Sequence, residues 1–276
     1  MPRYYSLGEG VPAVTQRGSQ VWTYPGDPVI VSYAHLVDGD SLDGSGQVDE
    51  YMILLPSDRV RVAIKGPTTP PIDVTGPAVV IMPPGESHCE AVGAAGVIRL
   101  SPARSRAVIH ASDAVPGDSD VRQVRGPSFE NLNSDRPRAY ALVDPSEDSG
   151  PPSGRIFTSA HVMIHWIRPR VGRRDRTKMN PHSHRDYSQA SLVLSGSYIL
   201  HLRTPWNEDA TRWRPDFHIR AESPSVTFMP KGIIHSTEWI GEGENRIVDV
   251  FSPPRRDIAD TEGWVINADD YDDLPA

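Results

Sequence analysis

Three histidines in the second half of the chain have the spacing of a metal site. His182 and His184 are separated by one residue, and His235 follows in the segment Pro-Lys-Gly-Ile-Ile-His. Side chains alternate along a β-strand with period two, so the first two imidazoles would point to one face. A third imidazole from a partner strand would leave coordination positions open for a substrate or for oxygen. The spacing therefore predicts a divalent metal centre.

Short apolar runs between turn residues must position these histidines. With 27 Pro and 22 Gly but 5 Phe among 276 residues, the composition is typical of many short strands. Strand-like runs occur in both halves, at residues 28–33, 50–55, 60–64, 77–82, 96–100, 161–167, 189–194, 198–202, 225–229 and 246–251. We predict an all-β fold in which helix is scarce.

One plan is repeated in the two halves of the chain. The segment 83–88, Pro-Pro-Gly-Glu-Ser-His, matches 230–235, Pro-Lys-Gly-Ile-Ile-His, with proline, glycine and histidine at the same offsets. Between the halves, residues 113–154 are rich in Ser, Pro, Asp and Arg, which is typical of a linker. The repeat predicts two domains.

The two halves differ in the metal ligands that they offer. Laying Glu50 over Gln189 places Asp43 and Ser45 where the second half has its paired histidines. The first half keeps Glu50 and His88, which are too few ligands to hold a divalent metal selectively. We expect His88 to be structural, and the alternative is that it lines a small-ligand pocket with Glu50.

These residues resemble the two motifs of the cupin superfamily, and the repeat resembles a bicupin. The first motif is His-x-His, three or four residues, Glu, six residues and Gly; here the glutamate place holds Gln189, and the glycine is Gly196. The second motif is Pro-x-Gly-x-x-His-x-x-x-Asn, which 230–235 matches with Trp239 in the last place.

The resemblance implies two cupin barrels of the jelly-roll type, also called the double-stranded β-helix. It implies a degenerate N-terminal barrel in residues 1–125, a linker at 126–154 and a metal-binding C-terminal barrel in 155–276. It indicates a family and not a reaction, because this fold supports dioxygenases, isomerases, decarboxylases, lyases and plain binding proteins.

The metal would be held by His182, His184 and His235, with Gln189 either as a further ligand or set back as a donor. Imidazole suits Fe(II), Zn, Mn, Ni and Cu, and we expect one divalent transition metal, with Fe(II) favoured. Because Gln189 replaces a carboxylate, the charge of the ion is uncompensated, which favours an anionic ligand. We expect a small carboxylate-bearing or polyoxygenated substrate.

Other side chains near the motifs are candidates for acid–base chemistry and for substrate binding. Tyr187, which follows the ligand pair, and His201 are the candidate general acids or bases. Arg168 begins an arginine-rich segment leading to the histidines, and with Arg203 it is expected to attract an acidic substrate. Trp206 is a candidate wall of the pocket. The alternatives are an ordinary strand histidine and a solvated basic loop.

Three functions are consistent with these residues. Fe(II)-dependent dioxygenation is favoured, with the metal binding substrate and oxygen together. In a lyase or isomerase, the metal would act only as a Lewis acid while Tyr187 or His201 moves protons. In a non-catalytic module, the cavity would only bind a small ligand.

Charge and composition bear on partners and location. The formal net charge of −8 argues against nucleic acid as a partner. The first residues lack the apolar stretch of a signal peptide, no run approaches the roughly 20 apolar residues of a membrane span, and Cys89 is the lone cysteine. We therefore expect a cytoplasmic protein without a membrane partner. Exposed edge strands would allow a homodimer.

Overall fold

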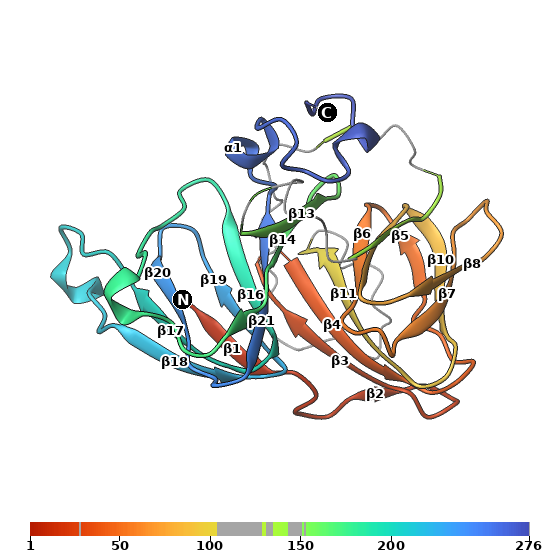
Figure 1. Cartoon of the computed structure of the whole chain (residues 1–276), viewed down its shortest axis with the longest axis horizontal. Coiled ribbons are helices and arrows are strands. Elements are labelled where there is room, and N and C mark those ends of the chain that lie inside the picture. The colour runs from red at the N-terminus through yellow and green to blue at the C-terminus, as the bar shows by residue number, and fades with distance from the viewer. Residues whose placement is uncertain (28, 104–128, 131–134, 143–150, 152, 276) are drawn as a thin grey trace.

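The computed structural model describes residues 1–27, 29–103, 129–130, 135–142, 151 and 153–275, and it confirms the all-β prediction (Figure 1). Helical structure in these ranges consists of α1 (Arg256–Ala259) and the 3-10 turns η3 (Arg176–Lys178), η4 (Ala210–Arg212) and η5 (Ala268–Asp270). None of these helices has the length and apolar character needed to cross a membrane. Most of the expected linker, 126–154, lies outside the described residues.

The N-terminal barrel is built from two antiparallel sheets, drawn on the right of Figure 1. The larger sheet has the order β12-β9-β6-β11-β4-β3-β2, and the smaller has the order β5-β10-β7-β8. Apolar side chains of both sheets, such as Ile53 and Ile64, pack together in its core. The strands are β2 (Ala13–Val14), β3 (Gln20–Pro25), β4 (Val29–Leu36), β5 (Gly44–Gln47), β6 (Tyr51–Leu55), β7 (Arg61–Lys65), β8 (Ile72–Thr75), β9 (Ala78–Met82), β10 (Gly85–Ala91), β11 (Ala95–Pro102) and β12 (Arg138–Ala141).

The C-terminal barrel has the same construction. Its larger sheet has the order β1-β19-β16-β21-β14-β13, with β15 beside β21, and its smaller sheet has the order β18-β17-β20. Val193 and Leu200 belong to its core. The strands are β1 (Arg3–Ser6), β13 (Gly154–Thr158), β14 (Met163–Ile167), β15 (Arg170–Val171), β16 (Ser188–Ser195), β17 (Ser197–Arg203), β18 (Phe217–Glu222), β19 (Ser225–Met229), β20 (Ile234–Trp239) and β21 (Glu244–Ser252).

Two strands cross the domain boundaries that the sequence suggested. Strand β1, expected in the N-terminal barrel, pairs with β19 of the C-terminal barrel. Strand β12, expected in the linker, pairs with β9 of the N-terminal barrel. Both cover edge strands whose backbone groups would otherwise lack partners. Neither β1 nor β12 carries a turn or motif that indicates which sheet it joins.

The large sheets of the two barrels share a buried core. Met52 and Leu54 of β6 pack in one cluster with Ala190 and Leu192 of β16. The alternate residues of β6, such as Ile53, face the interior of their own barrel. Strand β6 is therefore buried on two faces, which explains why its sequence is a continuous apolar run.

Strand register corrects the overlay of the two halves by one residue. Met82 and Met229 stand directly before the matching proline turns, and their Cα partners are Tyr51 and Gln189. Tyr51 is therefore the counterpart of Gln189, where the overlay assigned Glu50. A slip of one residue moves a strand side chain to the opposite face. Glu50 consequently lies on the face of β6 that is turned towards the other barrel.

The place in the N-terminal barrel that corresponds to the metal motif is filled by side chains. The Tyr51 hydroxyl contacts Oγ of Ser87 at 2.6 Å, and both residues are fully buried. A Cβ added to Gly44 would lie 2.7 Å from the same Oγ. His88, the residue matched to the third histidine, is half-exposed instead and pairs with Asp43 at 2.9 Å.

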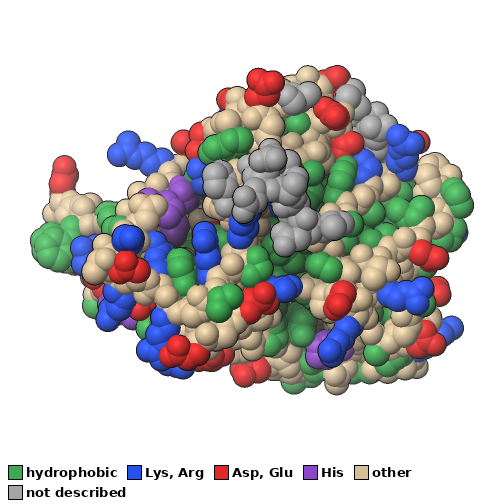
Figure 2. All heavy atoms as spheres, in the orientation of Figure 1, with side chains coloured by type: hydrophobic (Ala, Val, Ile, Leu, Met, Phe, Trp, Pro, Cys, Tyr) green, Lys and Arg blue, Asp and Glu red, His purple; other side chains and the backbone are tan. Residues whose placement is uncertain are grey.

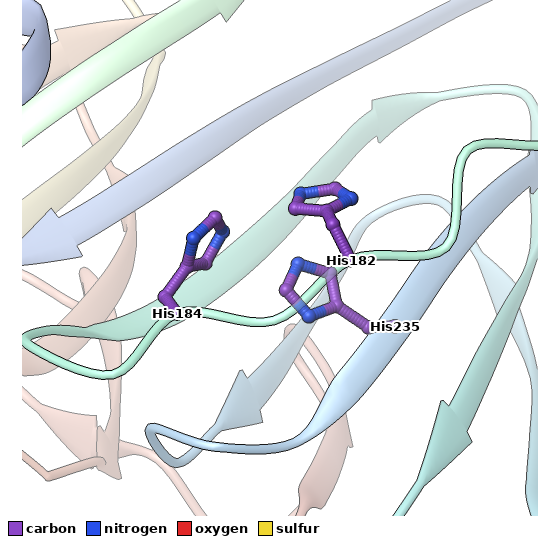
Figure 3. A group of neighbouring side chains, drawn as sticks. All are labelled: His182, His184 and His235. Carbon is purple, nitrogen blue, oxygen red and sulfur yellow. The ribbon is translucent and has the colours of Figure 1, made fainter.

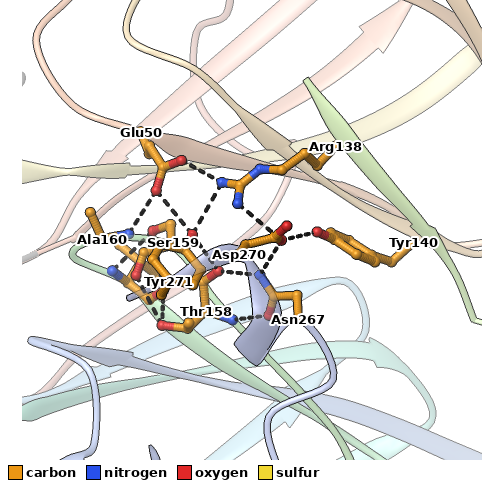
Figure 4. Close-up of polar contacts among 10 residues, drawn as sticks. Glu50, Arg138, Tyr140, Thr158, Ser159, Ala160, Asn267, Asp270 and Tyr271 are labelled. Carbon is orange, nitrogen blue, oxygen red and sulfur yellow. Dashed lines mark hydrogen bonds and ion pairs between the residues drawn. The ribbon is translucent and has the colours of Figure 1, made fainter. Parts of the chain in front are cut away.

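A buried ionic network joins the C-terminal segment to both barrels (Figure 4). Glu50 pairs with Arg138 of β12, and it accepts hydrogen bonds from Tyr271 Oη at 3.0 Å and from the Ala160 N–H at 2.9 Å. Arg138 also pairs with Asp270 at 2.9 Å. Buried charges are tolerated when they are paired and hydrogen-bonded. The network therefore fixes the C-terminal segment against the barrels.

Candidate metal centre

Backbone hydrogen bonds bring the paired histidines beside the third one. His182 and His235 form an isolated antiparallel bridge, with N–H to carbonyl distances of 3.0 and 2.7 Å. The Gly232 N–H donates to the His184 carbonyl at 2.6 Å. Gly232 has a φ of +85°, which glycine adopts without steric cost in the turn after Pro230. The pair thus lies in the segment between η3 and β16, where His182 forms the bridge and His184 lies outside it, and His235 lies on β20.

The three imidazoles face a common space (Figure 3). Each offers one nitrogen, and these nitrogen atoms all lie within 4.8 Å of one another. The ring centroids of His182 and His235 are 4.5 Å apart, and those of His184 and His235 are 5.1 Å apart. If the three rings moved slightly towards a shared ion, each could form one metal–nitrogen bond. The residues predicted as metal ligands are therefore assembled as a group.

The second nitrogen of each ring is held by the protein. Nδ1 of His182 lies 2.8 Å from the Asn180 carbonyl, and Nδ1 of His235 lies 3.0 Å from the Ile233 carbonyl. A carbonyl partner requires Nδ1 to carry the hydrogen, which leaves Nε2 with its lone pair. This arrangement suits metal binding through Nε2.

His184 provides the test of whether a metal fits the site. Its Nδ1 lies 2.6 Å from the Tyr187 hydroxyl. Its Nε2 is buried and makes no hydrogen bond within the described part of the chain. A buried nitrogen without a partner is costly, and a metal among the three rings would supply one. The donor set and this nitrogen therefore fit a transition metal.

Burial keeps His184 and His235 neutral. Loss of solvent lowers the pKa of His184 to about 3, with the nearby imidazoles of His235 and His182 adding to the effect. Burial is also the main cause that lowers the pKa of His235. Neutral imidazole is the form that binds metals, so these two rings are ready to bind at neutral pH.

Gln189 lies beside the triad on β16. The residue is buried, and its Oε1 is 3.1 Å from Nε2 of His235. Its Nε2 donates to Oγ of Ser191 at 3.2 Å. The amide oxygen is therefore turned towards the position where a metal would bind, and the predicted role of Gln189 as a ligand or a donor stays a prediction.

Tyr187 contacts the predicted ligand His184 and also lines the hollow beside it. The Tyr187 ring stacks on the His184 ring with centroids 4.4 Å apart. The Arg255 guanidinium lies 5.2 Å from the centroid of the Tyr187 ring. Burial raises the pKa of Tyr187 well above its usual value. The hydroxyl can thus orient the His184 ring, and its predicted acid–base role stays a prediction.

His201 lies on the opposite face of the small sheet from His235. Leu202 is the direct cross-strand partner of His235, so the two share a face and His201 takes the other one. The His201 ring contacts Nδ1 of His218 at 2.8 Å and Glu238 at 2.9 Å. Its contacts give no support to acid–base chemistry at the triad.

The candidate substrate-binding residues are engaged elsewhere. Arg203 forms a two-pronged salt bridge with Asp216, at 2.9 and 2.6 Å. Trp206 is 70% exposed and stacks on Trp213 with ring centroids 4.5 Å apart. Arg168 follows β14 and is partly exposed. Their predicted roles remain predictions.

Basic side chains do lie beside the triad, but they come from a segment that the sequence did not single out. A hollow of about 470 Å³ is lined by 183–187, which includes His184, and by 253–257. Arg185, Arg255 and Arg256 are among its lining residues. Figure 2 shows histidine side chains at the surface of the C-terminal barrel with Lys and Arg side chains near them. The Arg255-Arg256 pair after two prolines is the sequence signal that could have indicated this wall.

Comparisons with known proteins give the fold. No protein-family model matches the sequence, and no curated protein matches it. Among solved structures, oxalate decarboxylase from Lactobacillus farciminis in its formate complex has a TM-score of 0.57 and 13% identity, covering 91% of this chain and 86% of that chain. AerE from Microcystis aeruginosa has a TM-score of 0.56 and 8% identity over 88% of this chain and 97% of that chain. Protein Ylba from E. coli has a TM-score of 0.56 and 8% identity over 91% and 90%.

The similarity extends over both halves of the chain. The sequence identities, 8% to 13%, are so low that the likeness concerns architecture alone. Together with the two barrels and the His triad, it establishes a cupin fold that carries a candidate metal site in its C-terminal barrel.

Proposed function

We propose that this protein is a bicupin enzyme that binds one divalent transition metal through His182, His184 and His235 and acts on a small anionic molecule. The observation that carries the proposal is the buried Nε2 of His184, which faces the other two imidazoles without a hydrogen-bond partner among the described residues. A solved neighbour named oxalate decarboxylase supports a small carboxylate as the class of substrate.

The substrate class follows from charge. Gln189 offers a neutral amide oxygen where a carboxylate would have cancelled part of the charge of the ion. Arg185, Arg255 and Arg256 line the hollow next to His184 together with Asp186 and Asp257, and Arg255 pairs with Asp257 at 2.6 Å. An anionic group bound at the metal would balance its charge.

Fe(II)-dependent dioxygenation is the reaction that we propose. A lyase or isomerase needs a protein group to move protons, and the two candidates are otherwise engaged: Tyr187 contacts His184, and His201 faces away from His235. A redox-active metal would bind substrate and oxygen side by side and supply the electrons for oxygen activation. The residues of this chain would then orient His184, turn the Gln189 oxygen to the ion and exclude bulk water.

Metal analysis and labelled oxygen test the proposal. Purified wild-type protein is expected to hold about one equivalent of transition metal, and His184→Ala is expected to lose it. His88→Ala, which alters a histidine of the other barrel, is the matched control and should retain the metal. With small hydroxy and oxo acids as substrates, turnover should place both atoms of labelled dioxygen in the product. Wild-type protein without metal would refute the site, and unchanged turnover under argon would refute dioxygenation.

A further inference from the structure

A chain of two hydrogen bonds runs from Gln189, beside the triad, into the interior of the C-terminal barrel. Nε2 of His235 lies 3.1 Å from Oε1 of Gln189, and Nε2 of Gln189 donates to Oγ of Ser191 at 3.2 Å. The Ser191 hydroxyl donates to Oδ1 of Asp249 at 2.5 Å. The chain therefore ends on a carboxylate of β21.

Strand register produces this chain. Ser191 of β16 lies directly opposite Asp249 of β21, and Gln189 is two residues along β16 on the same face. Asp249 stands in the apolar run Ile247-Val-Asp-Val-Phe251, where a carboxylate is costly unless it is paired. His165 of β14 is its partner on the other side. Burial raises the pKa of Asp249, and hydrogen bonds from Ser191 and Gln189 together with the charges of His165 and His182 oppose that effect.

The Ser191 hydroxyl gives the chain a direction. It has one hydrogen, and the 2.5 Å distance to Asp249 is typical of O–H···O⁻ bonds. The Ser191 oxygen must then accept from the Gln189 amide nitrogen. Only one orientation of the amide satisfies this requirement, and in that orientation Oε1 faces the triad. An amide turned the other way would point an N–H group at the metal position.

We propose that Asp249 is a positioning residue for the metal centre, and that it acts through Ser191 to hold the Gln189 amide with its oxygen towards the metal. This inference rests on the proposed metal site. It explains how an amide replaces a carboxylate ligand, because a carboxylate presents an oxygen in either orientation and an amide does so in only one. Ser191 and Asp249 remove that ambiguity.

Titration with Co²⁺ alone tests the inference, with the visible absorption of the bound ion as a second readout of its ligands. In Asp249→Asn, the new amide donates to Ser191, so the serine donates to Gln189 and the Gln189 amide turns over. Ser191→Ala removes the connection and keeps the carboxylate. Both variants are expected to bind Co²⁺ about 10- to 100-fold more weakly, as removal of groups that orient ligands typically does, and to show an altered spectrum.

Thr227→Val is the matched control. Thr227 is the cross-strand neighbour of Ser191 on β19, and its buried hydroxyl makes no hydrogen bond in the part of the chain that is described. We expect its Co²⁺ affinity to stay within about twofold of wild type, because substitutions outside the metal-orienting contacts leave ligand geometry unchanged.

A Gln189→Leu background separates positioning from a general structural effect. Because Asp249 is proposed to act through the amide, Asp249→Asn should cause no further loss of affinity once Gln189 is Leu. Full additivity of the two losses would overturn the inference. Unchanged affinity and spectrum in both Asp249→Asn and Ser191→Ala would also overturn it while leaving the metal site intact, and Ser191→Ala decides the matter if Asp249→Asn does not fold. Wild-type protein that fails to bind Co²⁺ would refute the metal site itself.

Discussion

Replacing Glu50 by Gln tests how the two barrels and the C-terminal segment are held together. The carboxylate is buried, pairs with Arg138 and accepts hydrogen bonds from Tyr271 and the Ala160 N–H. Gln keeps the shape but removes the charge and turns one acceptor into a donor. Breaking a buried ion pair from one side costs about 3–5 kcal/mol. Because Arg138 retains Asp270 at 2.9 Å, we expect a loss of about 2–3 kcal/mol.

The free energy of unfolding in urea measures this loss. Glu244→Gln is the control, because it breaks the pair between Arg246 and Glu244, whose side chains are 33% and 45% exposed. An exposed pair contributes about 0.5 kcal/mol or less. If Glu50→Gln were no more destabilising than Glu244→Gln, the argument that the network holds the segments together would be refuted. Limited proteolysis should in addition release the C-terminal segment of Glu50→Gln faster than that of wild type.

Three further predictions concern the histidines and the N-terminal barrel. Tyr187→Phe removes the hydroxyl from Nδ1 of His184, and metal titration should show about tenfold weaker binding, whereas unchanged affinity would argue against an orienting role. Lowering the pH from 7.5 to 5.5 should destabilise the metal-free protein by about 1 kcal/mol, after allowance for the partial exposure of the His184 ring. The unfolded chain takes up protons at His184 and His235 near pH 6.5, and burial lowers the pKa of both in the folded chain. Urea unfolding at both pH values measures this loss of stability. If a His184→Gln variant lost as much stability as wild type between the two pH values, the assignment of the loss to His184 would be contradicted. Tyr51→Phe removes the hydroxyl that contacts buried Ser87, which keeps its longer hydrogen bond to the Gly44 carbonyl at 3.4 Å, and should cost about 1–2 kcal/mol. The metal content of Tyr51→Phe should equal that of wild type. A loss of metal would contradict the assignment of the metal site to the C-terminal barrel.

The sequence determined the fold class and the identity of the triad. Alternating apolar runs with Pro and Gly between them specify strands, because side-chain period and turn chemistry are local properties. The His-x-His pair and the later Pro-x-Gly-x-x-His turn indicated the three imidazoles, and the structure brings them within 4.8 Å. Such motifs can be recognised in a sequence because the ligands lie on short segments whose local geometry directs their side chains towards one point.

Register and partner choice were decided only by the tertiary structure. Whether Glu50 or Tyr51 corresponds to Gln189 depends on a shift of one residue, which reverses the face of every side chain and changes nothing in composition. The sheet that β1 joins, and the meeting of Ser191 with Asp249, are likewise contacts between segments far apart in the chain. A sequence states which groups can bind or donate, and only the packed strands decide which of them meet.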